Sequence, residues 1–302
     1  MITKELGRTG VFIPELGIGT SNYHAGPGPL RQGLERGALF LDTAESYGTE
    51  DVVGQSVKGM RDRVFIATKV SPQNFRAADL RRSVENSLLR LGIDTVDLVQ
   101  LHYPNPSIPI AETMGAMAGL VDAGKVKYVG VSNFSVAQLR EACQALGKYP
   151  VVSNQVRYNL IDRTIEADLL PYCQANHITV IAYTPLARGL HRIRDCDPGG
   201  IVDQVARETG KSPAQVVLNW CLSKDGVVAI PMSNSAEHLL ENCESSGWRL
   251  TAPQLALLNT RIQYRHRNRL DTLLRRHLPG RLQSLALKTA KWLPRGLRRR
   301  FT

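Results

Sequence analysis

Eight short apolar segments recur along the chain at nearly even intervals, and this repeat restricts the possible folds more than any other feature. The segments span residues 16–19, 38–41, 64–67, 96–99, 126–129, 151–153, 178–181 and 227–230. Neighbouring segments lie about 30 residues apart on average, which is the length of a strand–helix–strand unit. Amphipathic stretches separate them, such as 80–91 and 135–146, and Ser135 is placed to cap the second helix.

Eight strand–helix units in about 250 residues predict an α/β fold, a (β/α)8 barrel. An open doubly wound sheet is the alternative, and its first strand normally leads into G-x-G-x-x-G. Here G-I-G at 17–19 is followed by Asn22 in place of the third glycine, and G-P-G at 26–28 is followed by Arg31. The barrel is therefore favoured. Residues 2–13 predict a small β-hairpin with a glycine-rich turn, which would cap the closed end of the barrel.

The positive charge of the chain is confined to its last forty residues. The 302 residues carry 38 Lys and Arg against 27 Asp and Glu, a net charge of +11. Residues 263–302 hold twelve of the bases and one acid, Asp271, so residues 1–262 are neutral overall. We expect two parts: a barrel over 1–262 and a basic, amphipathic helical tail over 263–302.

Two short helices are predicted in this tail, with Leu and Trp on one face and Lys and Arg on the others. The tail is interpreted as a solubilising extension, or as a contact for a protein partner or an anionic membrane surface. Nucleic-acid binding is not expected, because no known module is present and aromatic residues are few.

Cytoplasmic location follows from two expectations. No apolar run approaches the roughly 18 residues that span a bilayer, and the N-terminus has no apolar signal core. The five cysteines form no C-x-x-C pair, which predicts reduced thiols and neither a disulfide framework nor a metal site.

Chemically distinctive residues follow the predicted strands, at the end of a barrel where active sites lie. These residues are Thr20, Asp42, Lys69, His102, Ser132, Gln155, Tyr183 and Pro231. Tyr47 follows Asp42 by five residues, so a short loop can return its phenol to the carboxylate. Taken singly, each of Asp42, Tyr47, Lys69 and His102 has an ordinary interpretation as a capping, packing or solvated side chain. Four of them on one rim favour a catalytic site.

This set is suited to protonating an oxygen on which negative charge develops. The Lys69 ammonium is expected to lower the pKa of the Tyr47 phenol, while Asp42 holds the ammonium in place. His102 can orient or polarise a carbonyl oxygen. Reduction of that carbonyl also needs a hydride, which no side chain supplies, so a cofactor is required.

Several ordered motifs resemble those of the aldo-keto reductases. They are L-G-R-T-G at 6–10, L-G-I-G-T at 16–20, D-T-A at 42–44 with Y-G at 47–48, A-T-K at 67–69, Q-L-H at 100–102, G-K-V-K-Y-V-G-V-S-N-F at 124–134, N-Q at 154–155 with Y-N at 158–159, A-Y-T-P-L at 182–186, and I-P at 230–231 with E-N at 241–242. The resemblance covers residues 4 to about 259 and implies an NAD(P)H-dependent reductase of aldehydes or ketones. It implies Tyr47 as general acid, Lys69 and Asp42 as residues that tune it, and His102 as the group that holds the carbonyl.

The resemblance also implies where the cofactor binds. Ser132, Asn133 and Gln155 would grip the nicotinamide carboxamide, and Tyr183 would stack on the ring. The full implied set is Gly19, Thr20, Ser132, Asn133, Gln155, Tyr183, Pro185, Leu186, Arg188, Ser233, His238, Glu241 and Asn242. Basic residues that often hold the 2′-phosphate in the family are replaced by Met232 and His238. We expect NADPH, with NADH as the alternative and Arg188 as a second phosphate ligand.

The expected partner is a small carbonyl compound, entering past Tyr23, His24, Tyr103 and Pro104. Only about twenty residues separate Leu190 from the next helical pattern, which predicts short substrate loops. Two other functions stay open: a cofactor-bound regulatory protein with little turnover, and a lyase that uses Lys69 as a Schiff-base nucleophile. The sequence does not specify an oligomeric state.

Overall fold

Eight parallel strands form the barrel predicted from the repeat. The computed structural model describes residues 1–264 of the chain. The strands are β3 (Ile18–Gly19), β4 (Phe40–Asp42), β5 (Phe65–Val70), β6 (Val96–Leu101), β7 (Val126–Ser132), β8 (Val151–Arg157), β9 (Thr179–Tyr183) and β10 (Val227–Ile230), paired in that order. The predicted tail helices between residues 270 and 293 lie outside the described residues.

Main-chain hydrogen bonds between the first and last strands close the barrel. The Gly17 amide donates to the Ala229 carbonyl (2.9 Å), and the Gly19 amide donates to the Pro231 carbonyl (3.0 Å). A Cβ atom on Gly19 would lie 2.9 Å from the carbonyl oxygen of Ile230. Glycine at position 19 is therefore explained by strand closure, whatever else the residue contacts.

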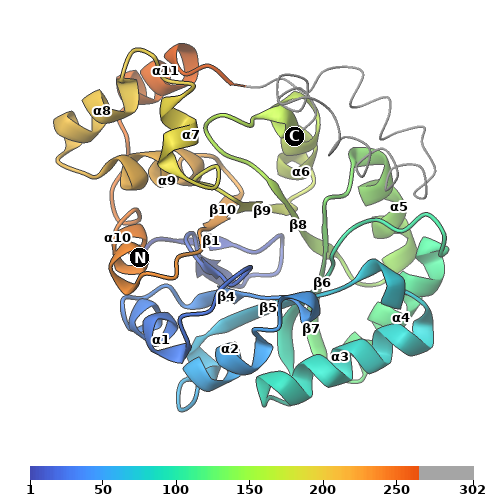
Figure 1. Ribbon diagram of the computed structural model, residues 1–302. Coiled ribbons are helices and arrows are strands. Elements are labelled where there is room, and N and C mark those ends of the chain that lie inside the picture. The colour runs from blue at the N-terminus through green and yellow to red at the C-terminus, as the bar shows by residue number, and fades with distance from the viewer. Residues whose placement is uncertain (265–302) are drawn as a thin grey trace, which may run out of the picture.

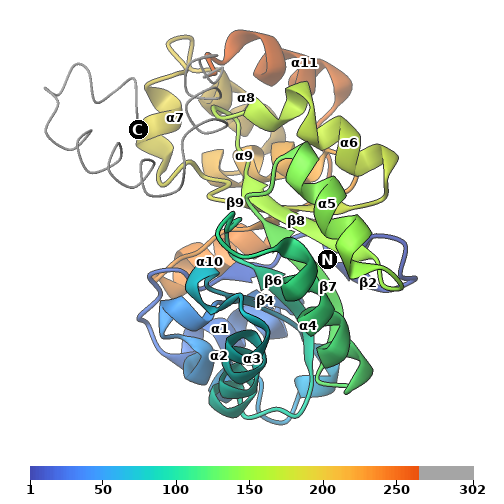
Figure 2. The same ribbon diagram turned by 90° about the vertical axis from the view of Figure 1, so that its right-hand side faces the viewer.

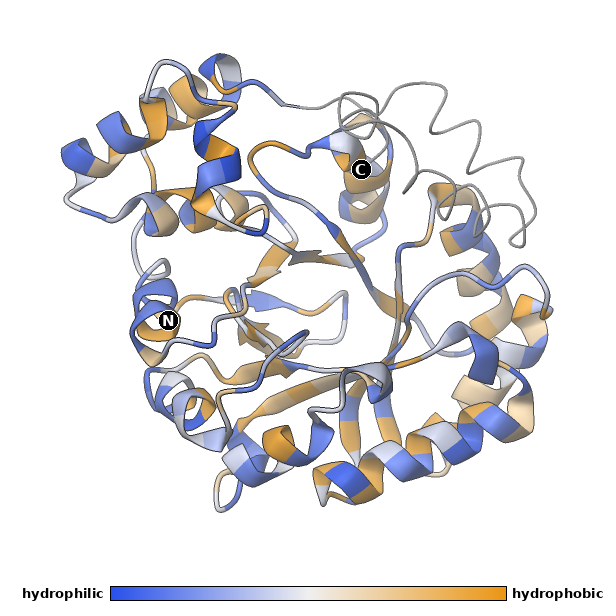
Figure 3. Cartoon of the chain, viewed as in Figure 1, coloured by the Kyte–Doolittle hydropathy of each residue, from blue (hydrophilic) through white to orange (hydrophobic). Residues whose placement is uncertain are grey.

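A helix follows each strand and covers the outside of the barrel (Figure 1). These helices are α1 (Pro27–Glu35), α2 (Glu50–Ser56), α3 (Ala77–Leu91), α4 (Ile110–Asp122), α5 (Val136–Leu146), α6 (Leu169–Ala175), α9 (Pro213–Leu222) and α10 (Ala236–Cys243). Ser135 caps α5 as predicted, in a reciprocal capping box with Gln138. The surrounding helices carry both hydrophobic and hydrophilic residues, as expected for amphipathic helices that pack on a sheet (Figure 3).

Three further helices are added after β9 and α10. They are α7 (Leu190–Arg194), α8 (Ile201–Thr209) and α11 (Ala252–Arg261), and they gather with α9 on one side of the barrel (Figures 1 and 2). The expectation of a helix-free stretch of about twenty residues after Leu190 is wrong. Asp197, itself nearly buried, accepts hydrogen bonds from the amides of Ile201 and Val202 and so starts α8.

The predicted hairpin pairs β1 (Thr3–Glu5) with β2 (Phe12–Pro14) in antiparallel register. Leu6 and Ile13 are buried in the same apolar cluster as the interior barrel residues, which include Phe40, Leu98 and Ile181. The hairpin thus closes the N-terminal end of the barrel and leaves the opposite end for chemistry. Within residues 1–264, no helix combines the length and apolar character needed to cross a membrane.

Candidate active site

An ion pair at the end of β4 and β5 forms the floor of the site. The Lys69 ammonium lies 2.5 Å from Oδ1 of Asp42 and also donates to the carbonyl of Thr43 (2.8 Å). Lys69 is completely buried and Asp42 almost so. Burial lowers the pKa of Lys69, and the Asp42 carboxylate opposes that effect. The pair is held by the barrel and is not a surface contact.

Two amides hold the other oxygen of Asp42. Gln155 donates from Nε2 to Oδ2 at 2.7 Å, and Gln100 donates to the same atom at 3.3 Å. Both side chains are buried. Gln100 was not among the predicted site residues, although an amide in the apolar strand Val96–Leu101 is a signal that could have found it. Asp42 is therefore fixed on both oxygens before any ligand binds.

Tyr47 lies beside this pair on a three-residue 3-10 helix, η1 (Glu45–Tyr47), that ends at Gly48 in the left-handed region. Its hydroxyl is 3.4 Å from Nε2 of His102, and Lys69 Nζ is 4.8 Å from the centre of its ring. The predicted four side chains therefore converge. The loop of five residues after Asp42 returns the phenol to the barrel mouth, as expected.

The protonation of Tyr47 differs from the expectation. Burial, followed by the Asp42 carboxylate, raises the pKa of the phenol above its ordinary value, so the expected lowering by Lys69 is wrong here. Removal of the phenol from water is the larger cause, and the Lys69 ammonium, which donates to Asp42 and Thr43, does not outweigh it. The phenol consequently stays protonated at neutral pH.

His102 is held neutral beside the phenol. Burial, with the Lys69 charge adding to it, lowers the pKa of His102 to about 4. Its ring stacks on Tyr103 with the centroids 5.0 Å apart, and its carbonyl accepts a hydrogen bond from Asn133 (3.2 Å). A neutral imidazole at this position can act as a hydrogen-bond donor to a substrate oxygen without carrying charge.

The predicted nicotinamide residues form one connected cluster at the ends of β7, β8 and β9. The Tyr183 hydroxyl donates to Oδ1 of Asn133 (2.9 Å), and the Ser132 hydroxyl donates to the Gln155 carbonyl (2.9 Å). Asn133 has a positive φ of 64°, a conformation that asparagine tolerates better than most residues. Gln155 connects this cluster to Asp42.

The loop after β9 has a strained backbone. Thr184, Ala187 and Arg188 have φ values of 50°, 54° and 66°, in the region that non-glycine residues rarely adopt. Pro185 is buried and Leu186 half-buried, whereas Arg188 is exposed. Within the described residues, the buried hydroxyl of Thr184 has no hydrogen-bond partner. Strain and an unsatisfied hydroxyl together are typical of a ligand-binding loop.

The remaining candidates surround the start of α10. Ser235 caps this helix, Ser233 lies in the preceding loop, and His238 is exposed in the first turn. Glu241 is half-buried and Asn242 buried further along α10. On the neighbouring strand end, Thr20 is completely buried, and its hydroxyl donates to the Asp42 carbonyl (3.0 Å). The Thr20 hydroxyl is thus already hydrogen-bonded within the barrel.

The predicted entrance residues differ in exposure. Tyr23 is buried with its hydroxyl donating to the Gly26 carbonyl (2.6 Å), while His24 and Tyr103 are exposed and Pro104 is half-buried.

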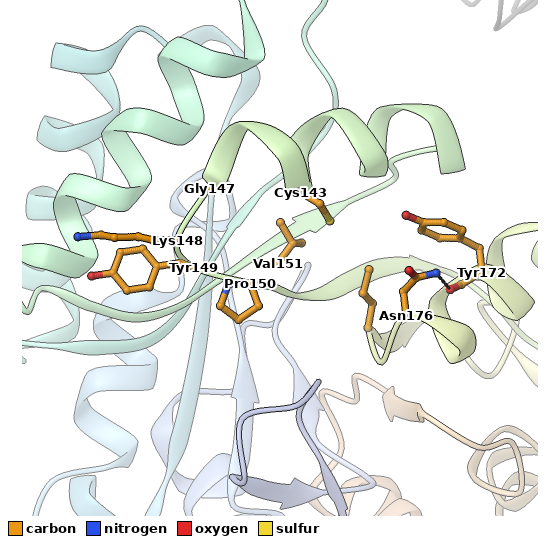
Figure 4. Close-up of a pocket in the computed structure, with 9 residues that line it drawn as sticks. Cys143, Gly147, Lys148, Tyr149, Pro150, Val151, Tyr172 and Asn176 are labelled. Carbon is orange, nitrogen blue, oxygen red and sulfur yellow. Dashed lines mark hydrogen bonds between the residues drawn. The ribbon is translucent and has the colours of Figure 1, made fainter.

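An unrelated groove of about 430 Å³ lies at the start of β8 and β9, between Tyr149 and Tyr172 (Figure 4). It is at the N-terminal end of the barrel, so it is not part of this site.

Comparison with known proteins identifies the class. The sequence matches the aldo/keto reductase family over residues 28–261. The chain therefore belongs to this family, and the predicted carbonyl reduction with a nicotinamide cofactor is confirmed at the level of the family.

Individual relatives match this chain along nearly their own whole length. Methylglyoxal reductase YeaE of Escherichia coli is 37% identical, over 82% of this chain and 91% of that protein. The thermostable aldo-keto reductase Tm1743, in complex with the inhibitor epalrestat, is 40% identical with a TM-score of 0.80, over 86% of this chain and 99% of that one. An aldo-keto reductase from Klebsiella pneumoniae, in complex with NADP and acetate, is 36% identical with a TM-score of 0.77, covering 87% and 99%.

Proposed function

We propose that this protein reduces the carbonyl group of a small aldehyde or ketone with NADPH, and that Tyr47 donates the proton. The observation that carries the proposal is the convergence of a protonated phenol, a neutral imidazole and a buried ammonium–carboxylate pair on one rim of the barrel. NADPH, when bound, supplies the hydride. All other steps fall to side chains of the chain itself.

Each side chain has a defined task. His102, neutral at physiological pH, donates a hydrogen bond that orients the substrate oxygen near the Tyr47 hydroxyl. Tyr47 transfers its proton as negative charge develops on that oxygen. The phenolate that remains is stabilised by the Lys69 ammonium, 4.8 Å from the ring centre. Asp42 keeps Lys69 charged in a buried position, and the two glutamines keep Asp42 in place.

The residues along the β7–β10 side fit a nicotinamide dinucleotide. Tyr183 offers an aromatic face and Asn133 an amide at the strand ends. The unsatisfied Thr184 hydroxyl and the N-terminus of α10 are suited to anionic groups. The Klebsiella relatives in complex with NADP and NADPH support NADPH as the cofactor. Arg188 and His238 are the exposed residues that we propose for its 2′-phosphate.

The substrate we propose is a short aldehyde of the methylglyoxal type. The support is the similarity to the Escherichia coli methylglyoxal reductase, together with Tyr103 and His102 as stacked rings beside the reacting phenol. We also propose a cytoplasmic location, supported by the thiol state of Cys143, Cys173, Cys221 and Cys243.

The test is a titration with NADPH and NADH by fluorescence, followed by the absorbance loss of NADPH with a panel of aldehydes that includes methylglyoxal. We expect binding of NADPH and turnover that depends on Tyr47. Binding without turnover on any aldehyde would favour a regulatory protein instead. A carbonyl compound trapped on Lys69 by borohydride would favour a lyase, although the complete burial of that ammonium makes it inaccessible as a nucleophile.

A further inference from the structure

The turn that carries Tyr47 is too short to hold the phenol by itself. It is a single 3-10 turn over Glu45–Tyr47, in which the Tyr47 amide donates to the Ala44 carbonyl (3.0 Å). Its C-cap, Gly48, has a positive φ of 67° and adds no side chain to pack. Since 3-10 turns have weak internal hydrogen bonding, the orientation of Tyr47 must be set by contacts outside the turn.

Glu45, two residues before Tyr47, supplies such contacts. Its Oε1 accepts hydrogen bonds from the amide of Ser71 (2.6 Å) and from Nδ2 of Asn74 (3.0 Å), and its Oε2 accepts one from the Ser83 hydroxyl. Asn74 also donates to Ser83 (3.0 Å), so the three donors form one cradle. All three donors are neutral, and together they hold both oxygens of the Glu45 side chain.

The cradle belongs to the segment that follows the Lys69 strand. Ser71 is the first residue after β5, and Asn74 ends the short 3-10 helix over Pro72–Asn74. The same segment also binds the loop after β6, because Asn105 donates to the Pro72 carbonyl (2.8 Å). Residues 71–74 therefore connect the loops of the three reacting groups: Tyr47, Lys69 and His102.

We propose that Glu45 is a positioning residue that fixes Tyr47 relative to Lys69 and His102 through this cradle. The proposal rests on the proposed carbonyl reduction. Glu45 does not contact the reacting atoms. It acts by joining the Tyr47 turn to the backbone two residues beyond Lys69, so its loss lets the phenol move while the Asp42–Lys69 pair stays in place.

The kinetic test uses Glu45→Ala, Glu45→Gln and a matched control. In Glu45→Ala, kcat for aldehyde reduction should fall on the order of tenfold to a hundredfold, because a small misplacement of a reacting group is costly. The KM and the dissociation constant for NADPH should stay within about twofold. Glu45→Gln keeps one acceptor oxygen and should recover part of kcat.

The control is Glu112→Ala. Glu112 also accepts a backbone amide, that of Ala77 (3.1 Å), and pairs with Arg76 (2.7 Å), but it does not touch the Tyr47 turn. Its kcat should match wild type. A wild-type kcat in Glu45→Ala, or equal losses in Glu45→Ala and Glu112→Ala, would overturn the proposal.

A second measurement separates this proposal from the proposed function. Protein labelled with ¹³C in its tyrosine rings gives a Tyr47 resonance that the Tyr47→Phe variant identifies. That resonance should shift or broaden in Glu45→Ala and stay unchanged in Glu112→Ala. If the wild type turns over no aldehyde, the proposed function fails, and the resonance still decides the role of Glu45. An unchanged resonance in Glu45→Ala shows that Glu45 does not position Tyr47.

Discussion

The two halves of the barrel mouth are built differently. On the β4–β6 side, Asp42 and Lys69 are buried and bonded to each other, and Asp42 also accepts hydrogen bonds from Gln100 and from Gln155 of β8. On the β7–β10 side, Arg188 and His238 are exposed, and the loop after Tyr183 has a strained backbone. The side chains around Asp42 and Lys69 are already ordered in the folded protein. Arg188 and His238 lose side-chain freedom only when a ligand binds, and that loss reduces the binding free energy. The proton-transfer half should thus be the more sensitive to substitution.

The largest effect is expected from Tyr47→Phe. Removing the hydroxyl eliminates the proton donor and leaves the ring in contact with Lys69 and His102. Turnover of aldehydes should fall on the order of a hundredfold to ten-thousandfold, the range for general acid catalysis. Steady-state kinetics measure this loss, and fluorescence titration should show unchanged NADPH binding. A variant that keeps more than about a tenth of wild-type turnover would remove Tyr47 from the mechanism.

Asp42→Asn should destabilise the folded protein. It leaves the Lys69 ammonium buried without its counter-charge, and breaking a buried pair in this way costs about 3–5 kcal/mol. Urea unfolding of the protein without cofactor measures the loss. The matched control is Glu35→Gln, which breaks an exposed pair with Arg31 on α1 and should cost far less. Equal losses would show that the buried pair does not organise this half.

Aldehyde reduction and alcohol oxidation should depend differently on pH. Reduction needs the protonated phenol, and since the pKa of Tyr47 is raised, its rate should be flat from about pH 6 to about pH 9. The pKa of His102 is lowered to about 4, so this residue does not change its charge over the same pH range and does not alter the reduction rate there. Oxidation needs the phenolate and should rise about tenfold per pH unit. A reduction rate that falls near neutral pH would contradict this prediction.

The features that the sequence predicts are those that depend on residues close together in the chain. The eight strands and the outer helices follow from hydrophobic period. The positions of Asp42, Lys69 and His102 on one rim follow from the strand ends. Ser135 is recognised as a cap because its partner lies three residues away. Each of these signals is local in the chain.

What the sequence does not predict depends on long-range contacts. The raised pKa of Tyr47 results from burial and from the nearby Asp42 carboxylate, and the spacing of residues does not reveal how deeply the phenol is buried. Gln100 and Glu45 were missed because their partners lie on other strands and loops. The helix α8 begins on the Asp197 carboxylate, in the stretch after Leu190 that the sequence predicted to be a short loop.

On the cofactor side, Tyr183 should contribute to binding and little to chemistry. Tyr183→Ala removes the aromatic face and should weaken NADPH binding about tenfold, as expected for one stacked ring. Tyr183→Phe keeps the ring and loses the hydroxyl that donates to Asn133, so its effect should be smaller. Fluorescence titration measures both. If the two variants weaken binding equally, the hydroxyl rather than the ring holds the cofactor.

The smallest effect concerns the choice between NADPH and NADH. Arg188 and His238 are exposed, and contacts made at the surface contribute little because water competes for them and salt screens the arginine charge. Arg188→Ala and His238→Ala should each weaken NADPH binding only a few-fold and leave NADH binding unchanged, and the difference should shrink at high salt. Arg192→Ala, an exposed arginine on α7, is the control and should change neither. If all three variants leave NADPH binding unchanged, the preference for NADPH over NADH is set by hydroxyl and amide groups around Ser233 and the N-terminus of α10.

The β7–β10 side would then recognise phosphate by hydrogen bonds alone. A titration at two salt concentrations would show this as an affinity for NADPH that does not depend on salt.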